Sequence, residues 1–303
     1  MFTIYCIEKR KRVLTDLINS RIEKLQKEVQ YDNRRLQIEQ NILHCDENGT
    51  TDTKYCDHNI IVSLTTYGKR LHDVAIAIES IMEQTMKANR IVLWLDEGLR
   101  DKVLPNNLQL LQKRGLEIEY CKDLRSYKKL IPSLRKFPND AIITVDDDLI
   151  YHYDMLEPLI VSHVSNPDTI FFHRMHKITF DYQGNLKPYN EWEYLSKDDS
   201  QTTFVFFTSG GGTIFPPHCF DDEVLREDIF LDICKFADDV WWNAMALRSE
   251  VKRKCIKYTP SDCFLLNCEA QSDGLFNVNV LENKNDEQIK SVFSRYSLYE
   301  KLL

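Results

Sequence analysis

Four short apolar runs separated by helical segments constrain the fold more than any other feature of this sequence. The runs are rich in β-branched residues and span residues 60–64, 90–95, 116–120 and 141–145. Between them, apolar residues recur at helical spacing in residues 74–86, 104–113 and 127–136. Strands that alternate with helices predict an α/β fold whose mixed, mainly parallel sheet is flanked by helices.

Polar residues follow each of these four runs. They are Thr65 to Tyr67, Asp96 and Glu97, Asp123 and Arg125, and Asp146 to Asp148. In open α/β sheets, ligands bind outside the carboxyl ends of the strands. We therefore expect a ligand site where these four ends meet.

The triplet Asp146-Asp147-Asp148 is the most informative motif. Three adjacent carboxylates at the end of a buried strand repel one another and lose hydration, so a cation is expected to offset that cost. Hard oxygen ligands suit Mg²⁺ or Mn²⁺ held together with substrate phosphates. A solvated acidic turn or an Asp-rich helix start is the structural alternative.

Residues 59–248 resemble a bacterial glycosyltransferase of the GT-A fold, related to glycosyltransferase family 2. The segments that carry the resemblance are residues 63–70, 77–81, 84–85, 91–95, 125–130, 145–148, 173–176, 210–212 and 237–241. The resemblance implies a Rossmann-like GT-A domain, and it implies a sugar donor activated by a nucleoside diphosphate.

The resemblance also implies roles for residues that bind the donor. Asp146 and Asp148 match the outer positions of the DXD motif, where the last Asp binds the metal and the first contacts the ribose or the metal. Asp147 lies between them on the donor side. The other donor-binding positions are Thr65, Tyr67 and Asp96, although Asp96 stands in Trp94-Leu95-Asp96-Glu97 rather than the commoner Asp-Asp-Gly-Ser.

Basic residues close to a diphosphate would stabilise the leaving group. Arg125, Lys128 and Lys129 are the nearest candidates in the sequence, and a solvated helix face is the alternative for them.

Asp238 and Asp239 resemble the acidic pair that supplies the catalytic base in inverting enzymes of this fold. Such a base takes the proton of the acceptor hydroxyl while that hydroxyl attacks the anomeric carbon. Asp239 is the first choice for this role and Asp238 the alternative. We expect both to lie within one helix over residues 229–248.

Four residues are candidates for the acceptor side of the site. Trp242 is four residues after Asp238 on the expected helix, so its ring could stack on a sugar; the alternative is that Trp241 and Trp242 are core residues. Gly211, in a run of three glycines, suggests close backbone approach to a sugar or a flexible turn. His173 and His176 line the pocket or simply pack.

The flanking segments predict three parts: a long helix and linker in residues 1–57, the GT-A domain in 58–250, and a tail in 251–303 packed on the domain or extending it. Residues 8–44 lack Gly and Pro and carry an apolar stripe. This N-terminal helical extension could pack on the domain, pair with a second copy, or lie on a membrane surface.

Composition excludes several function classes. The formal net charge of −8 disfavours broad binding to nucleic acid. Nine scattered cysteines without a CxxC pair disfavour a zinc site built from Cys alone and fit reduced thiols. No signal-like or membrane-spanning run is present. We expect a cytoplasmic protein, with a peripheral location at the inner face of the membrane open.

These features together predict an enzyme, a metal-dependent glycosyltransferase of hexosyltransferase type. It would move a sugar from a nucleotide-sugar donor to a glycan or lipid-linked acceptor with inversion, in cell-surface polysaccharide synthesis. A Mg²⁺-dependent nucleotidyltransferase or phosphohydrolase and a non-catalytic helical scaffold are the alternatives.

Overall fold

A computed structural model describes residues 2–196, 204–256, 264–266 and 284–302, with side chains from residue 13 onward except at 264–265. Internal contacts divide the chain into two units, Met1–Cys45 and Asp46–Leu303. The predicted α/β class is confirmed in the second unit by a mostly parallel sheet with helices packed around it.

The first unit is one helix, α1 (Phe2–His44), and it begins earlier than the sequence pattern predicted. Several of its apolar side chains, including Ile18, Ile22, Leu25 and Val29, are between 44 and 57% exposed. Among the helices that the structure describes, none combines the length and apolar content that crossing a bilayer requires. Membrane contact and self-association of α1 both stay predictions.

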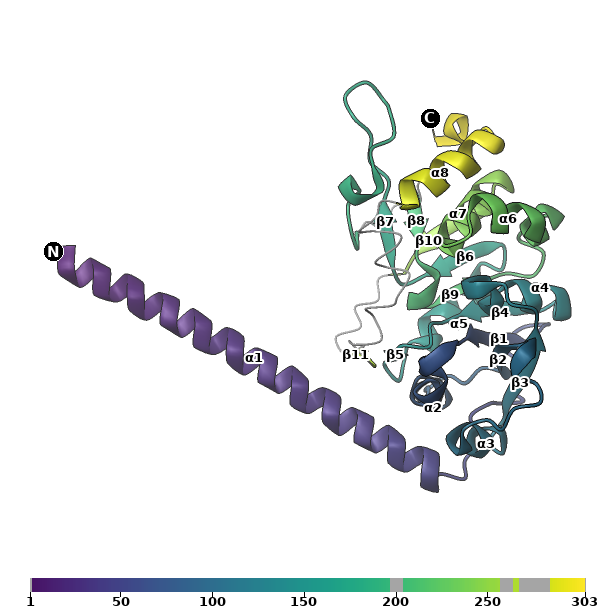
Figure 1. Ribbon diagram of the computed structural model, residues 1–303, viewed down its shortest axis with the longest axis horizontal. Coiled ribbons are helices and arrows are strands. Elements are labelled where there is room, and N and C mark those ends of the chain that lie inside the picture. Colours follow the sequence, from purple (N-terminus) through teal and green to yellow (C-terminus); the bar gives the residue numbers. More distant parts are fainter. Residues whose placement is uncertain (1, 197–203, 257–263, 267–283, 303) are drawn as a thin grey trace. The chain divides into compact units, whose positions relative to one another are not determined.

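The second unit is built on a seven-stranded sheet with the order β10-β6-β9-β4-β1-β2-β3 (Figure 1). Its strands are β1 (Ile60–Thr65), β2 (Arg90–Asp96), β3 (Leu116–Cys121), β4 (Ala141–Thr144), β6 (Thr169–Phe172), β9 (Thr213–Phe215) and β10 (Lys252–Cys255). All neighbouring pairs are parallel except those of β9, which runs antiparallel to β4 and β6. The four predicted strands therefore form one continuous parallel block.

Helices and short strands surround this sheet. The α-helices are α2 (Val74–Met82), α3 (Asn106–Gln112), α4 (Ile131–Lys136), α5 (Leu156–Ser165), α6 (Glu227–Ile233), α7 (Asp238–Arg248) and α8 (Lys284–Arg295). The 3₁₀ turns are η1 (Gly68–His72), η2 (Glu97–Leu99), η3 (Arg125–Lys129), η4 (Tyr189–Glu191), η5 (Ser209–Gly211), η6 (Asp222–Leu225) and η8 (Leu298–Leu302). Two small sheets pair β5 (Leu149–Ile150) with β11 (Phe264–Leu265) and β7 (Met175–Lys177) with β8 (Val205–Phe207).

Both faces of the main sheet are buried. Alternate strand residues such as Val92, Ile142 and Phe172 belong to one aromatic-rich core, which α7 and α8 complete. Their neighbours Leu93 and Ile143 are equally buried on the other side. This alternation follows from the two-residue period of a strand and explains why the central strands are apolar throughout.

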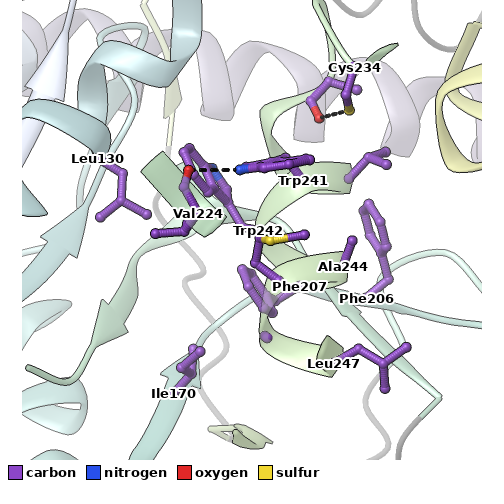
Figure 2. Close-up of a cluster of buried hydrophobic side chains, with 14 of the residues drawn as sticks. Leu130, Ile170, Phe206, Phe207, Val224, Cys234, Trp241, Trp242, Ala244 and Leu247 are labelled. Carbon is purple, nitrogen blue, oxygen red and sulfur yellow. Dashed lines mark hydrogen bonds between the residues drawn. The ribbon is translucent and has the colours of Figure 1, made fainter. Parts of the chain in front are cut away.

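Two predicted helices are divided in the structure. The segment 127–136 forms the end of η3 and then α4, and the segment 229–248 forms α6 and α7 with a break at Cys234 and Ala237. Asp238 and Asp239 therefore lie in the first turn of α7 rather than in the middle of a helix. Side-chain and backbone groups of the break pack inward, as the Cys234 thiol donates to the carbonyl of Ala237 (Figure 2).

The described C-terminal segments belong to the same unit as the sheet. β10 pairs with β6 along the edge, and α8 packs against α7. Figure 1 shows α8 beside α7 at the end of the sheet that carries β10. The rest of the predicted tail, residues 257–263, 267–283 and 303, lies outside the described residues.

Candidate functional site

The Asp triplet follows β4 directly and is held by residues that follow β1. The Arg70 guanidinium lies 2.9 Å from a carboxylate oxygen of Asp147 and 3.1 Å from one of Asp148. The Thr66 hydroxyl donates to the other Asp147 oxygen at 2.6 Å. Because β1 and β4 are neighbouring parallel strands, their carboxyl ends bring these groups to one edge of the sheet.

Lys129 connects the two acidic clusters that the sequence singled out. Its buried amine lies 3.1 Å from an oxygen of Asp146 and 3.1 Å from an oxygen of Asp238. Next to Asp238, Asp239 accepts hydrogen bonds from the backbone N–H of Ser209 at 2.9 Å and from its hydroxyl at 2.5 Å. The clusters from β4 and α7 therefore flank a single cation.

The carboxylates of the site differ in their pKa values. Burial, and then the charge of Asp146, raise the pKa of Asp148 to about 6. Burial, and then the charge of Asp238, likewise raise the pKa of Asp239 to about 6. Burial opposes ionisation of Asp146 too, but the positive charges of Lys129, Arg174 and Arg70 together outweigh it and lower the pKa of that carboxyl. Carboxylates with separated pKa values are typical of catalytic sites.

A close backbone approach fixes the position of Asp146. A side chain at Gly210 would place its Cβ 1.5 Å from a carboxylate oxygen of Asp146, so only glycine fits there. The Tyr151 hydroxyl accepts from the Asp146 N–H at 2.7 Å and donates to the Gly210 carbonyl at 2.5 Å. The three-glycine run thus closes against the acidic cluster, and Gly212 has a φ of +97° that favours glycine.

The charges of this group suit a divalent cation. Five carboxylates face three cations, which leaves a formal net charge of −2: the carboxylates are Asp146, Asp147, Asp148, Asp238 and Asp239, and the cations are Arg70, Lys129 and Arg174. Asp148 shares the Arg70 guanidinium with Asp147, and its pKa is raised by burial and by the neighbouring carboxylates, so negative charge is in excess at that position. Carboxylate oxygens are the donors that Mg²⁺ and Mn²⁺ prefer.

The predicted donor-binding residues lie at the ends of the strands, but they do not all reach the Asp cluster. Thr65 donates to the Trp94 carbonyl at 2.8 Å, and Asp96 accepts from the Gly98 N–H at 2.8 Å. Tyr67 is half exposed, with the Arg70 guanidinium 5.5 Å from its ring centre. Tyr67 therefore lies beside Arg70, the residue that pairs with Asp147 and Asp148.

Two of the three basic candidates have other partners. The Lys128 amine pairs with Asp123 at 3.0 Å, and the Arg125 guanidinium lies over the Phe236 ring at 5.1 Å. Lys129 instead of Lys128 meets the Asp cluster. The 3₁₀ turn η3 sends the two adjacent lysines in different directions, which the sequence could not show.

The acceptor-side predictions need one correction. Trp242 is fully buried, where it packs edge-on against Tyr127 at 5.1 Å and lies among the core side chains in Figure 2. A ring with no exposed surface cannot stack on a sugar, so the core alternative holds for both Trp241 and Trp242. The predicted stacking role of Trp242 is therefore wrong.

The other three predicted acceptor-side residues are Gly211, His173 and His176. Gly211 approaches the Arg174 side chain, and His173 contacts the Met155 carbonyl at 2.8 Å. Burial lowers the pKa of both histidines to about 4, so they are neutral. His176 stacks at 3.9 Å on Tyr194, whose ring is 46% exposed. Both histidines are buried, and Tyr194 presents the accessible ring.

Sequence reasoning gave no role to several residues that hold the site together. They are Thr66, Arg70, Tyr151, Arg174 and Ser209. Thr66 and Arg70 stand inside the segment that carries the family resemblance, so they could have been proposed from it. Arg174 stands inside another of these segments, residues 173–176, whereas Ser209 lies outside all of them and becomes visible only through the fold.

Comparisons with known proteins add no family assignment. Searches against family models and against curated proteins find no match to this chain.

One depression of about 510 Å³ is lined by charged residues of α4 and α6, where Arg135 pairs with Glu227. None of the predicted site residues lines it, so the acidic group at the end of β4 remains the candidate site.

The raised pKa of Asp148 predicts how stability depends on pH without a divalent cation. A carboxyl with a folded pKa of about 6 and an ordinary value of 3.8 binds more protons when folded. Its contribution to the free energy of unfolding therefore falls as pH rises from 4 to 6. We expect Asp148→Asn to gain stability relative to the wild type across that window, as urea unfolding at pH 4.5 and pH 7 would show. An unchanged difference between the two proteins would contradict the raised pKa.

Proposed function

We propose that this protein is a metal-dependent glycosyltransferase that uses a nucleotide-sugar donor. One observation carries the proposal: Lys129 joins the cluster suited to a metal diphosphate to the cluster suited to a base. A transferase needs these two functions within reach of one anomeric carbon. The resemblance in residues 59–248 points to the same chemistry.

Each part of the site has a task in this proposal. Asp146 and Asp148 hold the divalent ion, which would neutralise the charge that develops on the leaving diphosphate. Arg70 and Lys129 keep these carboxylates in place and add positive charge at the same edge. Tyr67, exposed beside Arg70, offers a ring for the nucleotide base.

Asp239 is the better of the two candidate bases. Asp238 forms an ion pair with Lys129, which ties up its charge. Asp239 is fixed by Ser209, and its raised pKa brings it close to the value at which a general base works best near neutral pH. The acceptor oxygen attacks the anomeric carbon, the bond to the diphosphate breaks with its electrons on phosphate oxygen, and Asp239 takes the hydroxyl proton. Such a single displacement inverts the configuration.

Binding of nucleotides separates this proposal from its alternatives. We expect isothermal titration to show UDP, GDP or CMP binding that requires Mn²⁺. The enzyme should then convert a sugar nucleotide into a glycoside of inverted configuration. The anomeric coupling constant in the proton NMR spectrum of the product would establish that configuration. Hydrolysis of the phosphate bond without sugar transfer would favour a phosphohydrolase, and no nucleotide binding would favour a scaffold.

We assign the acceptor-stacking role to Tyr194 instead of the buried Trp242. The exposed ring of Tyr194 stacks on His176, with the ring centres 3.9 Å apart, and packs edge-on against Tyr189, with the ring centres 6.1 Å apart. Aromatic stacking contributes about 1 kcal/mol, so we expect Tyr194→Ala to raise the acceptor KM about fivefold. Tyr182, 94% exposed, provides the matched control, and Tyr182→Ala should leave KM unchanged. Equal effects of both substitutions would remove Tyr194 from the acceptor site.

A further inference from the structure

Three potential metal ligands meet at the opposite end of β1 from the acidic site. Cys56 and His58 precede the strand, and His163 comes from the last turn of α5. The Cys56 sulfur and one nitrogen from each histidine all lie within 4.8 Å of one another. His163 is fully buried, and the other two are partly buried. The acidic site lies beyond the carboxyl end of β1, so the two groups are separate.

The hydrogen bonds within this cluster direct two ring nitrogens toward one point. Nε2 of His58 lies 2.8 Å from Nε2 of His163, and Nδ1 of His58 lies 2.8 Å from a carboxylate oxygen of Asp57. Because a carboxylate accepts, His58 donates through Nδ1 and turns the lone pair of Nε2 toward His163. A histidine whose far nitrogen donates to a carboxylate is the usual arrangement behind a metal ligand.

The protonation of His163 leaves one nitrogen unsatisfied. Its Nε2 must hold the proton that it shares with His58, so Nδ1 carries a lone pair. That Nδ1 is buried and has no hydrogen-bond partner among the described residues. Moving the proton from Nε2 to Nδ1, where no acceptor competes for it, would free the lone pair of Nε2 for a metal.

We propose that Cys56, His58 and His163 bind one Zn²⁺ ion, with a fourth position left to water. Thiolate and imidazole are ligands that zinc prefers, and three protein ligands with water at the fourth position are usual in an open zinc site. Zn–N bonds of about 2.0–2.1 Å in a tetrahedral site separate the two nitrogens by about 3.3 Å, so the rings must part by about 0.5 Å. On binding, the Cys56 thiol releases its proton to solvent.

The zinc ion would cross-link the segment before β1 to α5. Cys56 and His58 lie on the stretch that follows Cys45 and enters the sheet, whereas His163 is anchored in the core. Zinc that binds the folded chain but not the unfolded chain raises the stability of the folded state by mass action. This zinc cross-link does not depend on the proposed transferase activity.

Cobalt substitution tests the site directly. The full-length chain, free of any histidine tag, is titrated with Co²⁺ in excess Mg²⁺, which occupies hard oxygen sites. We expect one equivalent to produce tetrahedral d–d bands and a thiolate-to-cobalt charge-transfer band, both abolished by one equivalent of Zn²⁺. Binding at the Asp clusters would give no charge-transfer band. Its absence in the wild type would overturn the proposal.

Variants assign the ligands. Cys56→Ser should abolish the charge-transfer band, and His58→Asn should weaken Zn²⁺ binding at least tenfold. Asp57→Asn, at a side chain 95% exposed, should weaken it about 10–100-fold without affecting folding. Cys45→Ser is the control, since Cys45 is also partly buried but lies outside the cluster. A band that survives in Cys56→Ser, or disappears in Cys45→Ser, would refute the assignment.

Discussion

Replacing Lys129 by Met should lower the free energy of unfolding by about 3 kcal/mol, whereas replacing its neighbour Lys128 should cost less than about 1 kcal/mol. The Lys129 amine is buried between Asp146 and Asp238, and its removal leaves two carboxylates without their shared partner. The Lys128 amine pairs with Asp123, a side chain 60% exposed that water can solvate instead.

The asymmetry between these lysines follows from desolvation. A charge taken from water into the protein is tolerable only while it is paired, so breaking the pair costs far more than the pair itself contributes. Methionine keeps the length and most of the volume of lysine, so packing changes little in either variant. Urea unfolding at pH 7.5 without divalent cations measures both values under the same conditions.

A second substitution makes the test specific to the ion pairs. Asp238→Asn removes one of the two carboxylates that lose their partner in Lys129→Met. The double variant Lys129→Met, Asp238→Asn should therefore recover part of the stability lost in Lys129→Met. The double-mutant cycle should therefore show a favourable coupling. Additive effects, or equal losses in Lys128→Met and Lys129→Met, would show that Lys129 does not carry the link between the clusters.

The central strands could be predicted because their own residues determine that these segments form strands. Ile60 to Leu64 and Ala141 to Val145 are β-branched apolar runs that fit only a strand buried on both faces. Such runs also fix where the strand ends, and so the sequence placed Asp146 to Asp148 at the carboxyl edge. The strand order is not local, because it depends on which helix crosses which face.

Other elements could not be predicted because tertiary packing decides them. β9 has three residues, follows a glycine run and inserts antiparallel between β4 and β6. The break between α6 and α7 follows no Gly or Pro; it is set by core contacts such as the hydrogen bond from Trp241 to the Val224 carbonyl. Helical spacing alone therefore merged two helices into one.

The same limit separates predicted site residues from those that the fold supplies. The acidic clusters were visible because carboxylates at the end of an apolar run demand a partner. The partners themselves, Arg70 and Lys129, were ambiguous because lysines and arginines are also ordinary surface residues. Trp242 shows the opposite error, since a residue on the same helical face as Asp238 can still point into the core.

Asp239→Asn should reduce sugar transfer by about 10²–10⁴-fold while leaving metal-dependent nucleotide binding within twofold of the wild type. The amide keeps the shape of the side chain and can still accept the hydrogen bonds from Ser209. It cannot accept the acceptor proton. The loss should therefore appear in kcat, with little change in the donor KM.

Asp148→Ala should behave differently because it acts on the donor. Loss of this carboxylate removes a proposed ligand of the divalent ion, so Mn²⁺-dependent affinity for the nucleotide should fall at least tenfold together with transfer. Asp232→Asn, an exposed carboxyl on α6, serves as the control and should change neither quantity. Calorimetry and initial rates on the same preparations separate the two kinds of loss.

The pH profile connects the base to its surroundings. Protonated Asp239 cannot take a proton. Because the pKa of Asp239 is raised to about 6, the rate of the wild type should fall below pH 6. Ser209→Ala removes a hydrogen bond that favours the charged carboxylate, which should move this acid limb to higher pH. A limb that does not move would assign the titration to another group. Full turnover by Asp239→Asn would rule out Asp239 as the base, because no other feature of an amide could replace the proton acceptor.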